Sequence, residues 1–255
     1  RQNAQADQSN LQNIAQRFVS AKMDLICAIA TPAAQTMANA THDIPIVGTA
    51  ITDYEGAKLV ASNKEPKGNV TGTSDMNPVK EQIDLLLKIK PDAKTIGTVY
   101  CSSEVNSEVQ VKAMKEYAES KGLTVKVATI STVNDIQQAA QSLIGSVDAF
   151  YEPTDNIIAS AMPTLIDITN AAKVPVICGE PNMVKAGGLA TYGIDYYKLG
   201  VQTGHMAADI LEGKKPASMP IEMAKDLKVT VNKANAALLG ITFPEDVLKD
   251  ADVIE

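Results

Sequence analysis

Short apolar runs alternate with amphipathic segments along nearly the whole chain. The apolar runs have the length of buried strands, and the segments after them repeat apolar residues at helical spacing. Near-continuous apolar strands joined by helices are typical of parallel sheets that are covered on both faces. We therefore predict an α/β fold, with strands near residues 23–30, 44–50, 94–100, 123–130, 147–152, 174–178, 187–194 and 227–232, and helices over 9–22, 31–41, 77–91, 105–121, 133–144, 156–173 and 196–213.

Two of the predicted helices begin with capping signals. Ser9 and Gln12 have the spacing of a capping box at the start of the first helix. At the third helix, Asn77 is predicted to be the N-cap residue, with Pro78 as the first helical residue. Pro91 is expected to end that helix.

A polar, glycine-rich stretch over residues 56–78 interrupts the alternation, which then starts again. This interruption predicts two lobes with a boundary near residue 93. In open α/β sheets, ligands bind beyond the carboxyl ends of the strands. The polar residues that follow the strands are therefore the candidates for function.

Composition excludes several classes of function. The 255 residues carry a formal net charge of −7 without a cluster of basic residues, so nucleic acid is not expected as a partner. No apolar run approaches the roughly 20 residues of a membrane helix. Three cysteines and two histidines lack paired metal-ligand spacing, so neither a metal nor a cofactor is predicted. The cysteines are interpreted as small buried side chains.

Acids and hydroxyls recur where the predicted strands end, whereas lysine and arginine are absent there. Such a set suits a zwitterion, whose ammonium would bind Asp155 or Asp195. Its carboxylate would bind the free N–H groups of the turn at Thr31, although an ordinary strand–helix turn explains those residues equally well. Asp is also a favoured N-cap residue, so each acid has a structural alternative, and one carboxylate can serve both roles.

Several stretches resemble the ABC-transporter substrate-binding proteins related to tryptophan- and phenylalanine-binding lipoproteins. The resemblance is carried by residues 151–211, which open with "YEPTDNIIASAM", and by "AIATPAAQTMANAT" and "GTVYCSSEVNSEVQ". It covers nearly the whole chain. It implies a type I periplasmic-binding fold of two Rossmann-like lobes that close about a hinge. It also implies an amino-acid ligand, often aromatic, that passes to a membrane permease.

The resemblance further implies a set of ligand-binding residues. Thr31 and Ala33 would hold the ligand carboxylate, Asp155 would face the ligand, and Asp195 would lie on the hinge side. No catalytic residue is predicted. The full predicted set is Thr31, Pro32, Ala33, Thr49, Ser102, Ser103, Thr154, Asp155, Asn156 and Asp195.

The predicted first lobe comprises residues 1–93 and 196–222, and the second comprises 94–195 and 223–255. Members of the family begin with a βα unit before the segment that matches residues 2–10, and this chain opens on Arg1 without it. The first lobe is therefore expected to lack that unit and to expose a sheet edge. The protein is expected to be a monomer. It is also expected to lie outside the cytoplasm, either in the periplasm or lipid-anchored at the outer face of the cell membrane.

Two other functions stay open. The effector-binding core of a lac-repressor-like regulator has the same fold, although no helix-turn-helix precedes Arg1. A cofactor-independent amino-acid racemase uses one cysteine from each lobe. Cys101 and Cys178 both follow strands, but both fall in the predicted second lobe.

The identity of the amino acid is not predicted. Aromatic residues make up 4% of the chain and tryptophan is absent. A stacking platform for an aromatic ligand would therefore come from tyrosine or phenylalanine. The nearest candidates are Tyr151, Tyr192 and Tyr196, and core or hinge packing would explain each of them equally well.

Overall fold

A computed structural model describes all residues from Arg1 to Glu255. The chain divides into two compact units. Unit 1 comprises Arg1–Met76 and Asp195–Asp226, and unit 2 comprises Asn77–Ile194 and Leu227–Glu255. The α/β class and the two Rossmann-like lobes predicted from the sequence are confirmed.

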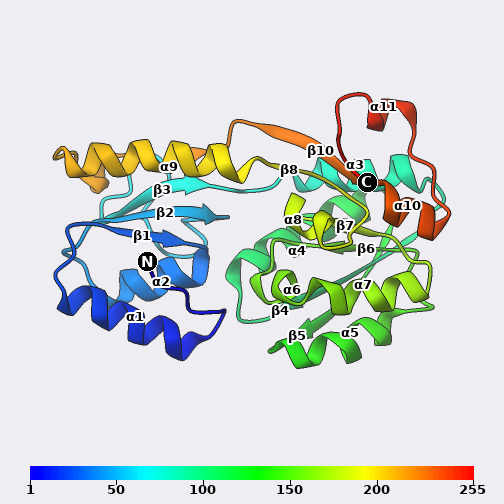
Figure 1. Ribbon diagram of the computed structural model, residues 1–255, viewed down its shortest axis with the longest axis horizontal. Helices are drawn as coiled ribbons and strands as arrows, with labels where there is room; N and C mark the ends of the chain where they lie inside the picture. The colour runs from blue at the N-terminus through cyan, green and yellow to red at the C-terminus, as the bar shows by residue number, and fades with distance from the viewer. The chain divides into compact units, whose positions relative to one another are not determined.

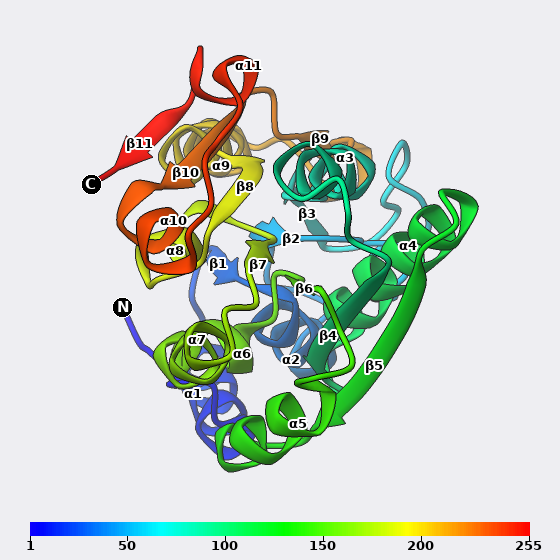
Figure 2. The same cartoon turned by 90° about the vertical axis from the view of Figure 1, so that its right-hand side faces the viewer.

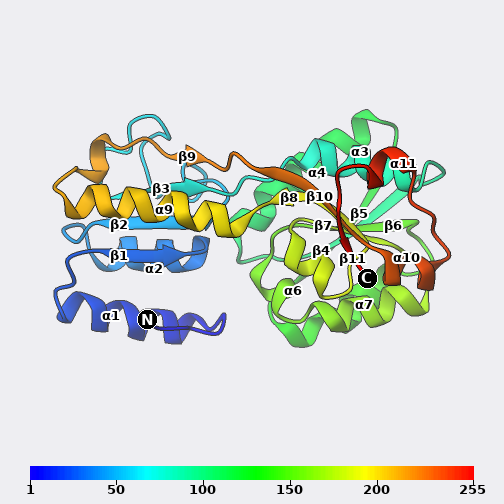
Figure 3. The same ribbon diagram turned by 45° about the horizontal axis from the view of Figure 1, so that its top comes forward.

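Unit 1 is built on a parallel sheet with the strand order β1-β2-β3-β9. Helix α2 covers one face of this sheet, and α1 packs against the outer side of α2. Helix α9 packs on β2 and β3 from the opposite face (Figures 1 and 3). The elements are β1 (Ile26–Ile29), β2 (Ile46–Ile51), β3 (Val70–Ser74), β9 (Glu222–Met223), α1 (Gln8–Ser20), α2 (Thr31–Ala40), α9 (Tyr196–Leu211) and the 3-10 helix η2 (Pro216–Ser218).

Strand β1 forms one edge of this sheet. Its side chains alternate between buried and exposed, and Ile29 is 65% exposed. An apolar side chain at an unpaired strand edge is unusual, because such edges template further strand pairing. Strand β1 is therefore an edge strand of the unit 1 sheet.

The sequence missed strand β3, which lies inside the polar stretch over residues 56–78. Its side chains alternate too little for a period-2 signal, since Thr71, Thr73 and Ser74 are buried and hydrogen-bonded. A Cβ on Gly72 would lie 2.1 Å from the carbonyl oxygen of Gly48, so only glycine allows β2 and β3 to approach this closely.

The capping box predicted at Ser9 and Gln12 is wrong. The N-cap residue of α1 is Asp7, whose carboxylate accepts a hydrogen bond from the N–H of Asn10 at 2.7 Å. The charged acceptor two residues upstream therefore begins the helix.

Unit 2 contains a mixed sheet with the order β11-β10-β8-β7-β6-β4-β5, in which only the β8–β10 pair is antiparallel. Its strands are β4 (Thr95–Cys101), β5 (Thr124–Ile130), β6 (Ala149–Glu152), β7 (Val176–Cys178), β8 (Ala190–Ile194), β10 (Leu227–Asn232) and β11 (Asp252–Ile254). Its helices are α3 (Val79–Ile89), α4 (Val105–Ser120), η1 (Val133–Asp135), α5 (Ile136–Leu143), α6 (Asn156–Ser160), α7 (Met162–Ala171), α8 (Pro181–Lys185), α10 (Lys233–Leu239) and α11 (Glu245–Leu248).

Two apolar cores lie on the two faces of the unit 2 sheet. One contains the buried faces of α3 and α4, and the other contains those of α5, α6 and α7 (Figure 2). Adjacent strand residues divide between them, because Tyr151 belongs to the first core and Phe150 to the second. This double coverage explains why the central strands β6 and β7 are buried at every residue.

Helix α3 belongs to unit 2, although the sequence boundary near residue 93 placed it in the first lobe. Its buried residues Ile83 and Leu86 share a core with Met114 of α4. The unit boundaries lie after Met76, Ile194 and Asp226, where the predicted ones followed residues 93, 195 and 222. The apolar period of α3 marks it as a packed helix but does not identify the sheet that it covers.

Gln82 fastens α3 to the unit 2 sheet. Its Nε2 donates to the carbonyl oxygens of Gly179 at 3.0 Å and Tyr192 at 2.9 Å. Its Oε1 accepts from the hydroxyl of Tyr151 at 3.0 Å. The side chain is fully buried, and its amide is satisfied on both sides, as a buried amide requires.

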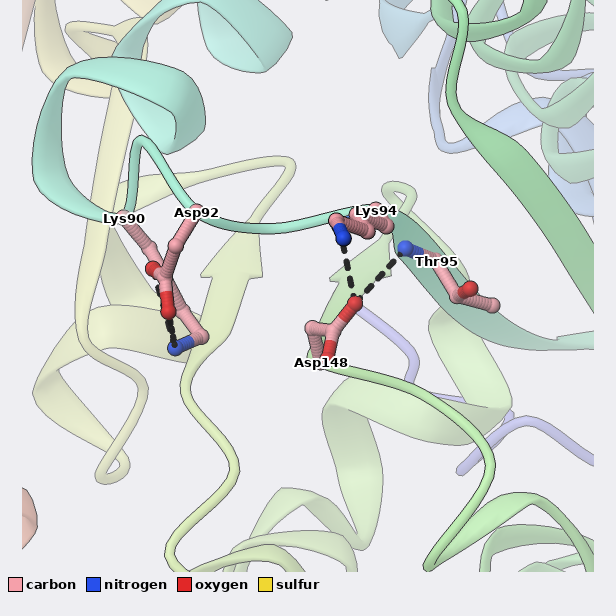
Figure 4. A network of polar contacts seen from close by, with 5 residues as sticks. All are labelled: Lys90, Asp92, Lys94, Thr95 and Asp148. Carbon is pink, nitrogen blue, oxygen red and sulfur yellow. Dashed lines mark hydrogen bonds and ion pairs between the residues drawn. The ribbon is translucent and has the colours of Figure 1, made fainter.

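The amino-terminal end of the unit 2 sheet is held by Asp148, which precedes β6. Its Oδ2 accepts hydrogen bonds from the N–H groups of Lys94 and Thr95, both at 2.8 Å (Figure 4). These two backbone donors lower the pKa of the Asp148 carboxyl. The nearby Lys90–Asp92 pair, at 3.3 Å, lies largely in solvent on the Asp92 side.

We predict that Asp148→Ala lowers the free energy of unfolding by about 1 kcal/mol near neutral pH, because two N–H groups lose their acceptor. Since the folded-state pKa of Asp148 is lowered, its contribution is present above the unfolded-state pKa and disappears as pH falls through the folded-state pKa. Urea denaturation of both proteins along an acid titration measures this. Asp92→Ala is the control and should change the unfolding free energy by less than about 0.5 kcal/mol. Equal losses in the two variants would contradict the role of Asp148.

Candidate functional site

The predicted ligand-binding residues lie at the carboxyl ends of parallel strands, in two sets. Unit 1 carries one set and unit 2 the other, and each is described within its own unit. The unit 1 set is Thr31, Pro32, Ala33, Thr49 and Asp195, and the unit 2 set is Ser102, Ser103, Thr154, Asp155 and Asn156.

Helix α2 begins immediately after β1 without a side-chain cap. Its N-cap residue is Ala30, at φ 75° and ψ 154°, a backbone conformation that costs a non-glycine residue about 1–3 kcal/mol. Thr31 is buried at the first helical position, and Pro32 and Ala33 are half-buried. The first-turn N–H groups lack an intrahelical acceptor, so this end of α2 suits an anionic group.

Thr49 lies where β2 departs from regular pairing with β3. The register shifts between Gly48 and Ile51, and Ala50 has a left-handed φ of 52°. The hydroxyl of Thr49 is joined to the hydroxyls of Thr73 at 3.2 Å and Thr203 at 2.9 Å. This cluster ties β2, β3 and α9 together at the carboxyl end of the unit 1 sheet.

Asp75 is a unit 1 acid that the sequence interpretation missed. It follows β3, is 3% exposed, and accepts hydrogen bonds from the hydroxyls of Tyr196 at 2.7 Å and Thr52 at 3.3 Å. Burial raises the pKa of Asp75. Because β3 itself was not predicted, no strand end indicated this residue.

Asp195 begins α9, as the capping interpretation predicts. Its Oδ1 accepts from the N–H groups of Tyr197 at 3.0 Å and Lys198 at 3.1 Å. The residue is exposed and lines an open hollow of about 270 Å³ in unit 1, together with Lys198, Gln202, His205 and Asp226. The ligand role of Asp195 stays a prediction.

In unit 2, Asp155 caps α6 and is completely buried. Its Oδ1 accepts from the N–H of Ile158 at 2.9 Å. Its Oδ2 accepts from the N–H of Cys101 at 2.7 Å and from the hydroxyl of Ser107 at 2.8 Å. The carboxylate therefore joins the end of β4, the start of α4 and the start of α6. The capping role is confirmed, and the ligand role stays a prediction.

Glu104 is a second buried acid at the same helix, and the sequence interpretation did not select it. Its Oε2 accepts from the N–H of Asn156 at 3.0 Å and from the side-chain amide of Asn156 at 2.7 Å, and its Oε1 accepts from the N–H of Ile157 at 3.2 Å. Burial, followed by the negative charge of Asp155, raises the pKa of Glu104. The two contacts from Asn156 show that this residue is held by protein groups.

Thr154 lies in a polar cluster with two residues of α4. Its N–H donates to Oε1 of Gln110 at 3.2 Å, and its hydroxyl accepts from Nε2 of the same residue. Its carbonyl oxygen accepts from Nδ2 of Asn106 at 3.0 Å. Ser102 and Ser103, between β4 and α4, differ from Thr154 in that both are exposed.

Glu152 ends β6 and is completely buried. Its Oε1 accepts from the N–H of Val99 at 3.1 Å, whereas its Oε2 has no hydrogen-bond partner. Burial raises the pKa of Glu152 well above its usual value, and Asp155 adds to this effect. Burial therefore disfavours the charged form of the Glu152 carboxyl.

The cysteines of unit 2 do not have the properties of catalytic thiols. Cys101 and Cys178 are both buried in the same apolar core. Burial raises the pKa of the Cys178 thiol well above its usual value, whereas a reactive cysteine has a lowered pKa. The chain contains no cluster of three or more His, Cys, Asp or Glu side chains arranged to hold a metal ion. None of its helices combines the length and apolar character needed to cross a membrane.

A family model described as "ABC transporter substrate binding protein" matches residues 1–254. A tyrosine-binding protein of Clostridioides difficile (strain R20291) is 44% identical over 232 residues, which are 91% of this chain and 67% of that protein.

Two solved structures are also similar. The ABC domain in complex with L-Trp from Streptococcus pneumonia is 44% identical, with a TM-score of 0.94, and the match covers 98% of this chain and 86% of that one. A conserved domain protein of Vibrio cholerae is 40% identical, with a TM-score of 0.97, covering 100% and 86%. A LacI-family regulator of Bifidobacterium animalis, at 10% identity and a TM-score of 0.61, shares the fold alone.

We predict that Asp155→Ala lowers the free energy of unfolding by about 3 kcal/mol, because two N–H groups and a hydroxyl lose a buried acceptor. Asp195→Ala is the control, and loss of that exposed cap should cost about 1 kcal/mol. Urea denaturation measures both losses. Similar losses of unfolding free energy in the two variants would contradict the assignment of Asp155 as the buried connector. An unchanged ligand affinity in the folded fraction of Asp155→Ala would remove Asp155 from the predicted ligand-binding residues.

We also predict that Glu152→Gln flattens the pH dependence of stability. Since the folded-state pKa of Glu152 is raised, the folded protein retains a proton that the unfolded chain loses above about pH 4.3. The unfolding free energy of the wild type therefore falls as pH rises from there toward the folded-state pKa, by at most about 1.4 kcal/mol per pH unit. In urea denaturation, the unfolding free energy of the Gln variant should increase relative to that of the wild type over this pH range. Parallel pH profiles would contradict a raised pKa of Glu152 in the folded protein.

Proposed function

The chain belongs to the family of ABC transporter substrate-binding proteins, and from that premise we propose that it captures an aromatic amino acid for an ABC uptake transporter. Two relatives at 44% identity support the ligand class, since one is named as tyrosine-binding and the other was solved with L-Trp. The carboxyl ends of the strands support it independently.

The observation that carries the proposal is the chemistry of those strand ends. They carry hydroxyls, amides and carboxylates, such as Thr31, Thr49, Ser102 and Asp75, and no lysine or arginine. Hydroxyls and amides would also suit a sugar. The uncapped start of α2, however, favours an anionic group, and the acids favour a cationic group. A zwitterion has both.

The three candidate tyrosines differ in their suitability as an aromatic platform. Tyr151 is completely buried, and its hydroxyl is bonded to Gln82, so it serves the core of unit 2. Tyr192 packs against the same core. Tyr196 is half-buried at the start of α9, with its hydroxyl on Asp75. We propose Tyr196 as the aromatic contact among these three.

The rest of the proposal follows the family. The protein acts outside the cytoplasm, either periplasmic or lipid-anchored, as a monomer that delivers its ligand to a permease. Ligand capture proceeds by hinge closure, with a higher affinity for the closed form shifting the population. It is not an enzyme. The racemase alternative loses its support because Cys101 and Cys178 are buried in one unit, and no observation favours a regulator core.

We predict that L-tyrosine, L-tryptophan or L-phenylalanine raises the melting temperature of the purified chain. Ligand at about 100 times its dissociation constant adds about 2.7 kcal/mol to the unfolding free energy. A thermal-shift screen against all the amino acids measures this, with L-arginine, L-glutamate and L-arabinose as matched controls. A shift confined to arabinose or to a charged amino acid would contradict the proposal.

A further inference from the structure

Asn77, the first residue of unit 2, has a buried side chain that makes no hydrogen bond. The residue is 4% exposed, and neither its Nδ2 nor its Oδ1 has a partner. Only six buried side-chain nitrogen or oxygen atoms of the chain lack a partner, and Asn77 is the one residue that contributes two of them. Buried amides are nearly always bonded, so this exception requires an explanation.

The contrast with Gln82 shows how unusual Asn77 is. Both amides are buried, and both belong to the segment that leads into and forms α3. Gln82 uses its donor and its acceptor on protein groups. Leaving a buried amide unpaired costs about 1–3 kcal/mol for each group, so the segment tolerates at Asn77 a cost that it avoids five residues later.

Helix capping does not account for the side chain. The sequence predicts Asn77 as the N-cap residue, but the structure has Pro78 at that position without a side-chain hydrogen bond. The carbonyl oxygen of Asn77, not its amide, contacts the helix, by accepting from the N–H of Val79 at 2.9 Å. The side-chain amide is therefore not used by the helix that it precedes.

We propose that the amide of Asn77 binds the zwitterionic end of the amino-acid ligand. An amide has two N–H donors and a carbonyl acceptor on adjacent atoms. An amino acid has a carboxylate that accepts and an ammonium that donates, also in adjacent positions, so the two groups are complementary. Asn77 then recognises the part that all amino acids share, and other residues select the side chain. This inference rests on the proposed function.

The test is Asn77→Leu, which keeps the number and branching of the side-chain heavy atoms and removes both polar atoms. The affinity for L-tyrosine and L-phenylalanine should fall by a similar factor, about 10- to 100-fold, in isothermal titration calorimetry. The melting temperature of the ligand-free variant should not fall, because an unpaired buried amide is replaced by an apolar group. A stable variant that binds worse separates a ligand contact from a structural one.

Thr98→Val is the matched control. Thr98 lies in β4 of the same unit, is completely buried, and has an unpartnered hydroxyl. The substitution should leave both affinities unchanged. A fall in affinity equal to that of Asn77→Leu would overturn the assignment, because any loss of a buried polar atom would then have the same effect.

Ligand analogues test which end of the molecule Asn77 recognises. Tyramine lacks the carboxylate, so the ratio of its affinity to that of L-tyrosine should move toward unity in Asn77→Leu. An unchanged ratio, an unchanged affinity for L-tyrosine, or a loss for L-tyrosine but not L-phenylalanine would each overturn the proposal. If the wild type binds none of these ligands, the proposed function fails instead.

Discussion

The carboxylate of Asp155 is the interaction on which the carboxyl end of the unit 2 sheet depends. It accepts from an N–H at the end of β4, a hydroxyl in α4 and an N–H in α6, and it is completely buried. A buried charge is tolerated only when its acceptor positions are filled. The next residue, Asn156, is bonded in turn to Glu104, so the two buried acids together join the start of α4 to the start of α6.

The two ends of the unit 2 sheet use acids in opposite ways. At the amino end, Asp148 is held by backbone N–H groups that lower its pKa, so it is a stabilising carboxylate. At the carboxyl end, burial raises the pKa values of Glu104 and Glu152, so acids there destabilise the folded state as pH rises. Perturbed acids concentrate at functional sites, and this asymmetry agrees with ligand binding at the carboxyl end.

The fold was predictable where one rule sufficed. Buried parallel strands are apolar whatever their neighbours, so the alternation identified the α/β class. Strand β3 was missed because its threonines and Ser74 are buried through hydrogen bonds to other segments. Helix α3 was assigned to the wrong side of the boundary because its apolar period does not name its partner sheet. Asp75 was missed because β3, the strand that it follows, was not predicted. Glu104 was missed because its partners lie in a distant segment.

Local sequence therefore distinguishes structural from ligand-binding polar residues poorly. The degree to which their hydrogen bonds are satisfied distinguishes the two classes better. Asp155 and Asn77 both precede helices in similar chemical contexts, and both have favoured capping residue types. The structure gives Asp155 three donors and gives the side chain of Asn77 no partner. A saturated group has little capacity left for a ligand, whereas an unsaturated buried group gains most from one. Residues that bind ligand are thus better sought among buried polar groups that the fold leaves unpaired than among those it uses.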